Sequence, residues 1–171
     1  LLFSFSVVSV ITGIIGYVGI NNMGNINTLL DEMYNMHLSG ISYVKEANVQ
    51  LISMDRALRN LILSDTEEDR QLRINTISEY DRRFKEEMYN AEKTIISQEV
   101  RNIYNEALKA YSDYSVQRDN LISVVINSEM ANISREILVS TQITRQRADI
   151  IDNLITEFAD YKEHVGELAY D

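Results

Sequence analysis

The feature that most constrains this chain is the near absence of residues that end a helix. Its 171 residues include no proline, and only three glycines, Gly24, Gly40 and Gly166, follow residue 20. Proline removes a backbone donor, and glycine loses the most conformational entropy when it is ordered. A chain with so few of either has little to interrupt a helix. The sequence therefore predicts long helices and an all-α fold.

The first 20 residues differ in composition from the rest, because the first charged side chain of the chain is Asp31. Twenty helical residues at ~1.5 Å each span the roughly 30 Å of a bilayer core. Residues 1–20 are predicted to form a transmembrane helix, the alternative being a buried helix of a soluble protein. Basic residues are the ones retained on the cytoplasmic side. The acidic remainder, residues 21–171, is expected to be one domain outside the cytoplasm, periplasmic or extracellular.

Composition also excludes several classes of function. A formal net charge of −10 makes the phosphate backbone of a nucleic acid a poor partner. The chain has no cysteine, which removes disulfides, thiolate metal sites and a cysteine nucleophile. Its two histidines, His37 and His164, lie in no spacing typical of a helical metal site and are expected at different depths of the bundle. The sequence predicts no catalytic residue, no metal and no other cofactor.

Apolar residues recur at alternating spacings of four and three in four stretches, which is typical of helices that pack at a shallow angle. The predicted helices cover residues 24–63, 66–95, 98–126 and 129–171. Because the connections between them are short, neighbouring helices must run antiparallel. The prediction is an antiparallel up-down-up-down four-helix bundle that is continuous with the transmembrane helix.

Residues that commonly cap helices mark the three predicted turns. Ser64 and Glu67 are interpreted as a capping box before the second helix, and Ser97 as the N-cap of the third. At the third turn, Asn127 is expected in the left-handed conformation that often ends a helix.

Several polar residues stand at positions where the repeat requires apolar ones. Burying a polar group is costly unless it has a partner or serves a function, so these residues indicate a candidate ligand site. Guanidinium groups near hydroxyls suit a carboxylate, so an organic acid or an amino acid is the expected ligand. The candidate residues lie in the half of the bundle away from the membrane: Arg56, Arg59, Arg118, Tyr114, Arg135, Ser140, Thr141 and Thr144.

Some polar residues have a simpler interpretation. Arg59 is four residues from Asp55, and a surface ion pair between the two is the alternative to a ligand contact. Asp81 falls on the repeat of the second helix, and a slight rotation that places Tyr80 inside is expected to move Asp81 to the solvated flank.

Three stretches carry a resemblance to a known family. They are the apolar span that runs without a break into the first helix, residues 55–63 (DRALRNLIL) before the acidic turn at 64–68, and the regular small and apolar spacing of the last helix. Over essentially the whole chain, the arrangement resembles the four-helix-bundle sensor domain of bacterial methyl-accepting chemotaxis receptors. The resemblance implies a membrane receptor that binds a small-molecule ligand outside the cell and transmits a small helix displacement across the membrane.

A homodimer is also expected. Gly13, Gly16 and Gly19 form a stripe that lets two membrane helices approach. The first bundle helix also carries apolar residues off its main seam, at Leu29, Ile41, Ile52 and Ile62.

Three alternatives to a ligand-binding chemoreceptor stay open. The same type of sensor occurs on histidine kinases and other transmembrane signalling proteins. A solute-binding protein could dock on the distal tip, so that no small molecule enters the bundle. A membrane-anchored helical spacer would bind no ligand.

Overall fold

The computed structural model describes the backbone of residues 2–129 and 133–168, with the side chains of residues 2–7, 25, 29, 31–35, 167 and 168 left out. Every described element is a helix. The elements are α1 (Leu2–Glu32), the π-helical segment η1 (Met33–Leu38), α2 (Ser39–Ile62), α3 (Glu67–Glu92), α4 (Gln98–Ile126) and α5 (Arg135–Leu168).

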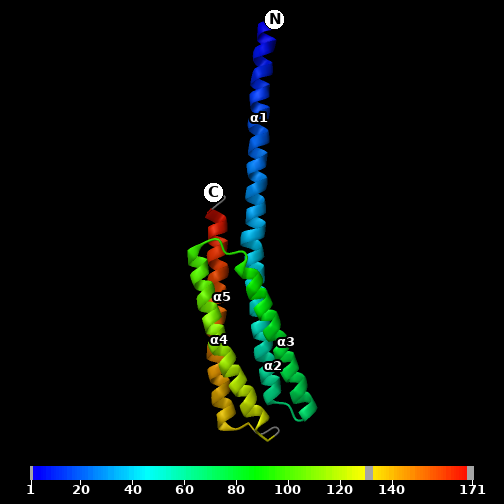
Figure 1. Cartoon of the computed structure of the whole chain (residues 1–171), viewed down its shortest axis with the longest axis vertical. Coiled ribbons are helices and arrows are strands. Elements are labelled where there is room, and N and C mark those ends of the chain that lie inside the picture. The colour runs from blue at the N-terminus through cyan, green and yellow to red at the C-terminus, as the bar shows by residue number, and fades with distance from the viewer. Residues whose placement is uncertain (1, 130–132, 169–171) are drawn as a thin grey trace.

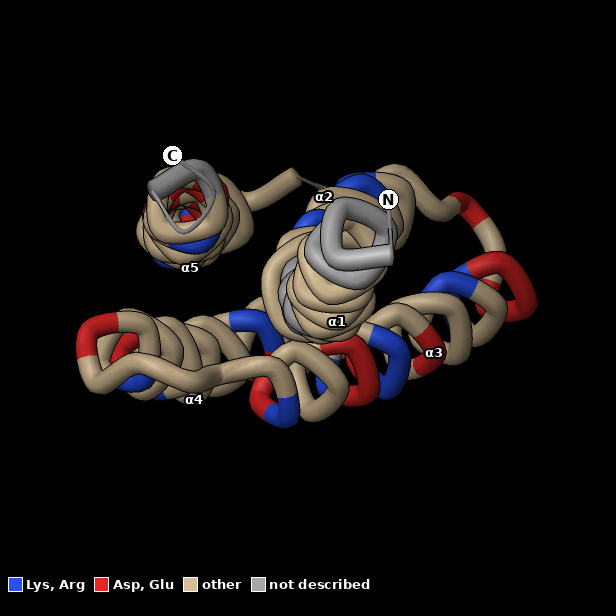
Figure 2. Tube along the Cα trace, turned by 90° about the horizontal axis from the view of Figure 1, so that it is seen from above, with Lys and Arg blue, Asp and Glu red and all other residues tan. Residues whose placement is uncertain are grey.

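The helices α2 to α5 form the bundle, and α1 projects from one end of it (Figure 1). The hairpins α2–α3 and α4–α5 lie side by side, and α5 packs against α2. The prediction of an all-α antiparallel four-helix bundle is confirmed. Figure 2 shows acidic and basic residues on the bundle helices, whereas α1 has no charged residue before Asp31.

The core follows the predicted alternation of apolar residues along α2 to α5. Its largest fully buried apolar side chains are Leu51, Met54, Leu58, Leu61, Ile77, Phe84, Met88, Tyr114, Leu121, Ile151 and Phe158. The predicted seam of the first helix starts too early, because Ile26 and Leu30 are 54% and 50% exposed. Both residues belong to α1, which lies above the bundle and has no bundle helix beside it at that level (Figure 1).

The apolar side chains of α1 that the structure describes, from Val8 to Leu30, are exposed. No helix among the residues that the structure describes is both long enough and apolar enough to cross a membrane. The first seven residues of the predicted span, 1–7, lie outside the described side chains.

Capping of the first two turns is partly as predicted. Ser97 is the N-cap of α4, and its hydroxyl accepts a hydrogen bond from the amide of Val100 at 3.2 Å. The capping box at Ser64 is wrong. The N-cap of α3 is Thr66, which accepts from the amide of Asp69, whereas Ser64 donates to the Asn60 carbonyl at 3.0 Å and to the Asp69 carboxylate at 2.7 Å. Ser64 therefore lies in the connection, where its hydroxyl bonds back to the end of α2 and does not cap α3.

The last helix begins at Arg135 and not at residue 129. Ser134 caps it, because its hydroxyl accepts from the amide of Ile137 at 3.2 Å. Asn127 is right-handed, with φ −82°, so the left-handed prediction is wrong. The Asn127 amide N–H and side-chain nitrogen both donate to the Ser123 carbonyl, which satisfies the end of α4 without a left-handed residue.

The later start of α5 changes the depth at which its residues lie. His37 is buried, with Nδ1 3.3 Å from the backbone oxygen of Lys162, and a Cβ at Gly166 would lie 3.7 Å from the His37 side chain. His37 therefore lies at the level of residues 162–166, which include the exposed His164. The expected difference in depth between the two histidines is wrong.

Candidate functional site

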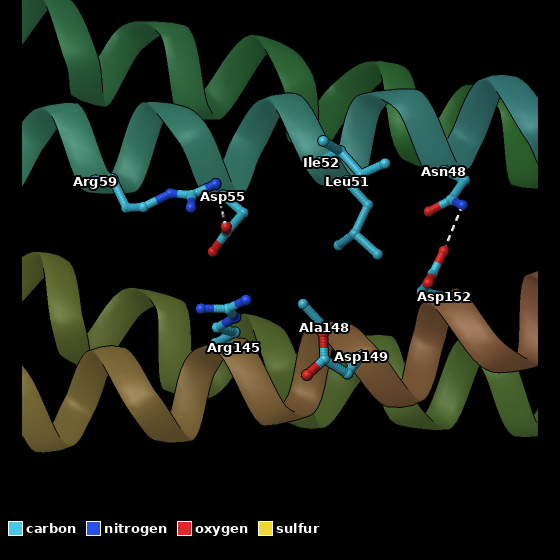
Figure 3. A pocket seen from close by; sticks show the side chains of 9 residues that line it. All are labelled: Asn48, Leu51, Ile52, Asp55, Arg59, Arg145, Ala148, Asp149 and Asp152. Atoms are coloured by element: carbon cyan, nitrogen blue, oxygen red, sulfur yellow. Dashed lines mark hydrogen bonds and ion pairs between the residues drawn. The ribbon is translucent and has the colours of Figure 1, made fainter.

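A groove between α2 and α5 brings together charged side chains from both helices (Figure 3). It encloses about 160 Å³. It is lined by Asn48, Leu51, Ile52, Asp55 and Arg59 from α2 and by Arg145, Ala148, Asp149 and Asp152 from α5. Spacings of three and four residues place each set on one face of its helix.

One end of the groove carries two guanidinium groups. Arg59 Nη2 lies 2.8 Å from the Asp55 carboxylate, and the Arg59 side chain is half exposed. Arg145 lies on the opposite wall, and Figure 3 shows its guanidinium directed towards α2 near Asp55. Within the described ranges, Arg145 has no hydrogen-bond or ion-pair partner. This end can therefore bind an anion through Arg145, with Arg59 opposite.

The other end of the groove offers acceptors. Asn48 donates from its side-chain nitrogen to the Asp152 carboxylate at 2.5 Å. The side-chain oxygen of Asn48 is buried and has no hydrogen-bond partner. A buried acceptor left unsatisfied costs about 1–3 kcal/mol, so a donor that enters the groove is favoured there. Asp149, which lies between Arg145 and Asp152 on the same wall (Figure 3), is exposed and adds a second carboxylate to the groove.

Of the residues predicted from the sequence to bind ligand, the structure places Arg59 in the groove and the others elsewhere. Arg56 is exposed on α2, and Arg135 is exposed at the first turn of α5. Thr144 is 1% exposed and donates to the Ser140 carbonyl at 2.9 Å. Thr141 donates to the Ile137 carbonyl at 2.7 Å, which leaves these hydroxyls bonded to their own helix.

Arg118 and Tyr114 are buried side chains of α4, and neither lines the groove. The Arg118 guanidinium bonds to Asp81 on α3 and to Asp119 on α4. Tyr111 donates to Asp81 at 2.5 Å, and its ring stacks on Phe84 with centroids 4.0 Å apart. Arg118 therefore uses its donors inside the protein.

The prediction that Asp81 lies on a solvated flank is wrong, because its side chain is only 17% exposed. Burial by itself raises the pKa of Asp81, but hydrogen bonds from Lys85, Tyr111 and Arg118 outweigh it and hold that pKa below its usual value. Asp81 is therefore the charged partner that allows Arg118 to occupy the core.

The groove contains four polar residues that the sequence did not single out: Asn48, Arg145, Asp149 and Asp152. The described residues hold no group of three or more His, Asp or Glu side chains placed for a metal ion. The groove is thus a polar site of mixed charge, formed by two helices that are far apart in the sequence.

Comparison with known proteins agrees with this architecture. The family described as a four-helix-bundle sensory module for signal transduction matches residues 1–171. No curated protein and no solved structure matches the chain. The family match covers α1 as well as the bundle that holds the groove. The chain therefore belongs to the family of four-helix-bundle sensory modules for signal transduction.

Proposed function

We propose that this chain is the extracytoplasmic sensor domain of a chemoreceptor, anchored in a membrane through residues 1–20, and that the groove between α2 and α5 binds an amino acid. The family supplies the sensory role. The anchor is supported by the absence of charge before Asp31, and the external location by the acidic bundle that follows.

The observation that carries the ligand proposal is the unpaired guanidinium of Arg145 opposite Arg59 (Figure 3). A carboxylate accepts two parallel hydrogen bonds from one arginine, and such charge-assisted pairs are stronger than neutral ones. Arg59 already shares its charge with Asp55. Arg145 is therefore the main carboxylate-binding residue of the proposal, and Arg59 adds positive potential from the other wall.

The remaining groups of the groove favour an amino acid over a dicarboxylic acid. Asp149 and Asp152 would repel a second carboxylate, whereas they attract an ammonium group. The unpartnered oxygen of Asn48 can accept one of the three hydrogen-bond donors of that ammonium group. Leu51 and Ile52 offer an apolar surface for the ligand side chain.

A ligand that touches both walls can change the packing of α2 against α5. It stabilises whichever arrangement of the two helices it binds more tightly. Because α2 continues through η1 into α1, a change in this packing reaches the end of the chain that is proposed to enter the membrane.

The proposed receptor is a homodimer with α2 in the interface. Val49 and Ile52 on α2 are 51% and 42% exposed, and a second copy would cover Val49 beside the groove and the outer part of Ile52, which also lines it. Ile41 and Ile62, also expected in the interface, are partly buried against the core of their own bundle, and the side chain of Leu29 lies outside the described residues. Val49 and Ile52 are therefore the apolar contacts on which the dimer proposal depends.

Arg145→Ala is expected to weaken amino-acid binding by tenfold or more, because it removes a charge-assisted contact worth about 1.5–3 kcal/mol. The ligand is found by thermal melting of the full chain with single amino acids, dicarboxylates and amines, since binding to the folded state raises the Tm. Its affinity for each variant is then measured by calorimetry.

Arg147→Ala is the matched control. Arg147 lies two residues further along α5 but lines a different groove, between α4 and α5. Its removal should leave the affinity unchanged. Equal affinities for the wild type and Arg145→Ala would place the ligand outside the groove. If no compound in the panel raises the Tm, direct sensing of amino acids is contradicted, and docking of a solute-binding protein or a spacer role takes its place.

A further inference from the structure

A buried lysine lies at the end of the bundle from which α1 emerges. Lys162 of α5 is 2% exposed. Its ammonium donates to the backbone oxygen of Thr94 at 2.6 Å and to the backbone oxygen of Met36. Lysine is almost never fully buried unless it is paired, because its charge is costly to remove from water. No carboxylate among the described residues pairs with it, so the two carbonyls are its partners.

One of those carbonyls belongs to the π-helical segment. Met36 lies in η1, the six-residue π-helix between α1 and α2. A π-helical turn holds one residue more than an α-helical turn, is rare in proteins and is frequently found at functional sites. One extra residue offsets the helix before it from the helix after it by about 100°. The π-helical form of η1 therefore determines the rotation of α1 about its own axis relative to the bundle.

The surrounding packing fits the lysine closely. A Cβ on Gly40, at the start of α2, would overlap the Thr94 hydroxyl and lie 2.8 Å from Lys162 Nζ, closer than such atoms approach in proteins. Thr94 comes from the connection between α3 and α4, and the buried His37 places Nδ1 3.3 Å from the Lys162 carbonyl. Residues of η1, α2, the α3–α4 connection and α5 thus meet around one ammonium group.

We propose that Lys162, His37, Gly40 and Thr94 form a clasp that holds η1 in its π-helical form and so determines the rotational position of α1. When α5 moves and the ammonium leaves Met36, η1 closes into an α-helix, whose regular pattern supplies the Met36 carbonyl with an amide donor. The helix α1 then turns by about 100° relative to the bundle. The idea that ligand binding moves α5 rests on the proposed function. The clasp itself does not depend on that function.

Spin-label distances measure this rotation, and the chain contains no cysteine that would interfere. One label is attached through Glu99→Cys at the exposed start of α4, and the second through either Ile26→Cys or Thr28→Cys on α1. Residues 26 and 28 are separated by about 200° around the helix. A rotation therefore lengthens one of the two distances and shortens the other, whereas a simple shift along the axis changes both in the same sense.

In the full chain in detergent, Lys162→Met is expected to change the two distances in opposite directions. The changes should be several ångströms and at most about 8 Å, the displacement of a point ~5 Å from the helix axis. Gly40→Ala should produce the same pattern, because its methyl group displaces both the Thr94 hydroxyl and the ammonium. If Lys162→Met does not fold, which circular dichroism detects, Gly40→Ala decides the question.

Gly166→Ala is the matched control, since a Cβ there would meet His37 at an ordinary contact distance of 3.7 Å. Both distances should stay at their wild-type values in this variant. Wild-type distances in folded Lys162→Met or Gly40→Ala would overturn the clasp, as would an equal change in Gly166→Ala. No ligand is used, so these outcomes are independent of those for Arg145→Ala.

Discussion

Asp81→Ala is expected to destabilise the bundle by about 3–5 kcal/mol, because it leaves the charge of Arg118 in the core without its partner on α3. The same change removes the acceptor of the Tyr111 hydroxyl. Small domains are stable by only about 5–15 kcal/mol, so the loss should be large in urea unfolding followed by circular dichroism at pH 7.

The control for this prediction is Asp113→Ala, which removes an exposed carboxylate from α4 and should change the free energy of unfolding by less than about 0.5 kcal/mol. The double variant Asp81→Leu, Arg118→Leu should be much more stable than Asp81→Ala, because replacing both charges leaves no unpaired ion. If Asp81→Ala lowers the free energy of unfolding by less than about 1 kcal/mol, the buried ion pair is contradicted, and Asp81 is better described as a solvated surface residue.

The free energy of unfolding should also depend on the titration of Lys162, whose pKa burial lowers from 10.5 to about 8. Between these values the unfolded chain holds a proton that the folded chain has released, so stability rises with pH. The wild type should gain about 2 kcal/mol relative to Lys162→Met between pH 8 and pH 10. Below about pH 7 the lysine is charged in both states, and this contribution no longer changes.

Urea unfolding of the two proteins at several pH values tests this expectation. Subtracting the variant removes the contribution of the tyrosines, which both proteins share. Parallel curves for the wild type and Lys162→Met would show that Lys162 keeps an ordinary pKa and is not held in a buried position.

The periodicity of the sequence was sufficient to predict the bundle, because burial of an apolar stripe dominates where no proline interrupts a helix. The third predicted helix, 98–126, agrees with α4 (Gln98–Ile126). Helix ends were predicted less well, since Ser64, Thr66 and Ser134 are all chemically able to cap and only the packing of the connections selects among them. The π-helical turn at η1 has no residue pattern that distinguishes it from the α-helix on either side.

The candidate site was predicted only in part. Arg59 was predicted because it lies in residues 55–63, a stretch that carries the family resemblance. Arg145 and Asp152 were missed because they lie beside the apolar seam, where polar residues normally contact solvent. Their role depends on the packing of α5 against α2, which the spacing within either helix does not specify. Arg118 was assigned to the ligand because its partner, Asp81, lies on another helix, and helical periodicity alone did not settle which way Asp81 faces.

The central claim is that the groove between α2 and α5 binds an amino acid through Arg145. It is tested most directly by NMR of the arginine Nε–Hε groups in the full chain, assigned with single Arg→Lys variants and titrated with the amino acid that raises the Tm most. The Arg145 and Arg59 signals should shift together and saturate with the affinity that calorimetry gives, while the signal of Arg118 stays in place. Saturable binding that leaves Arg145 unchanged and shifts Arg118 or Arg135 would contradict the account.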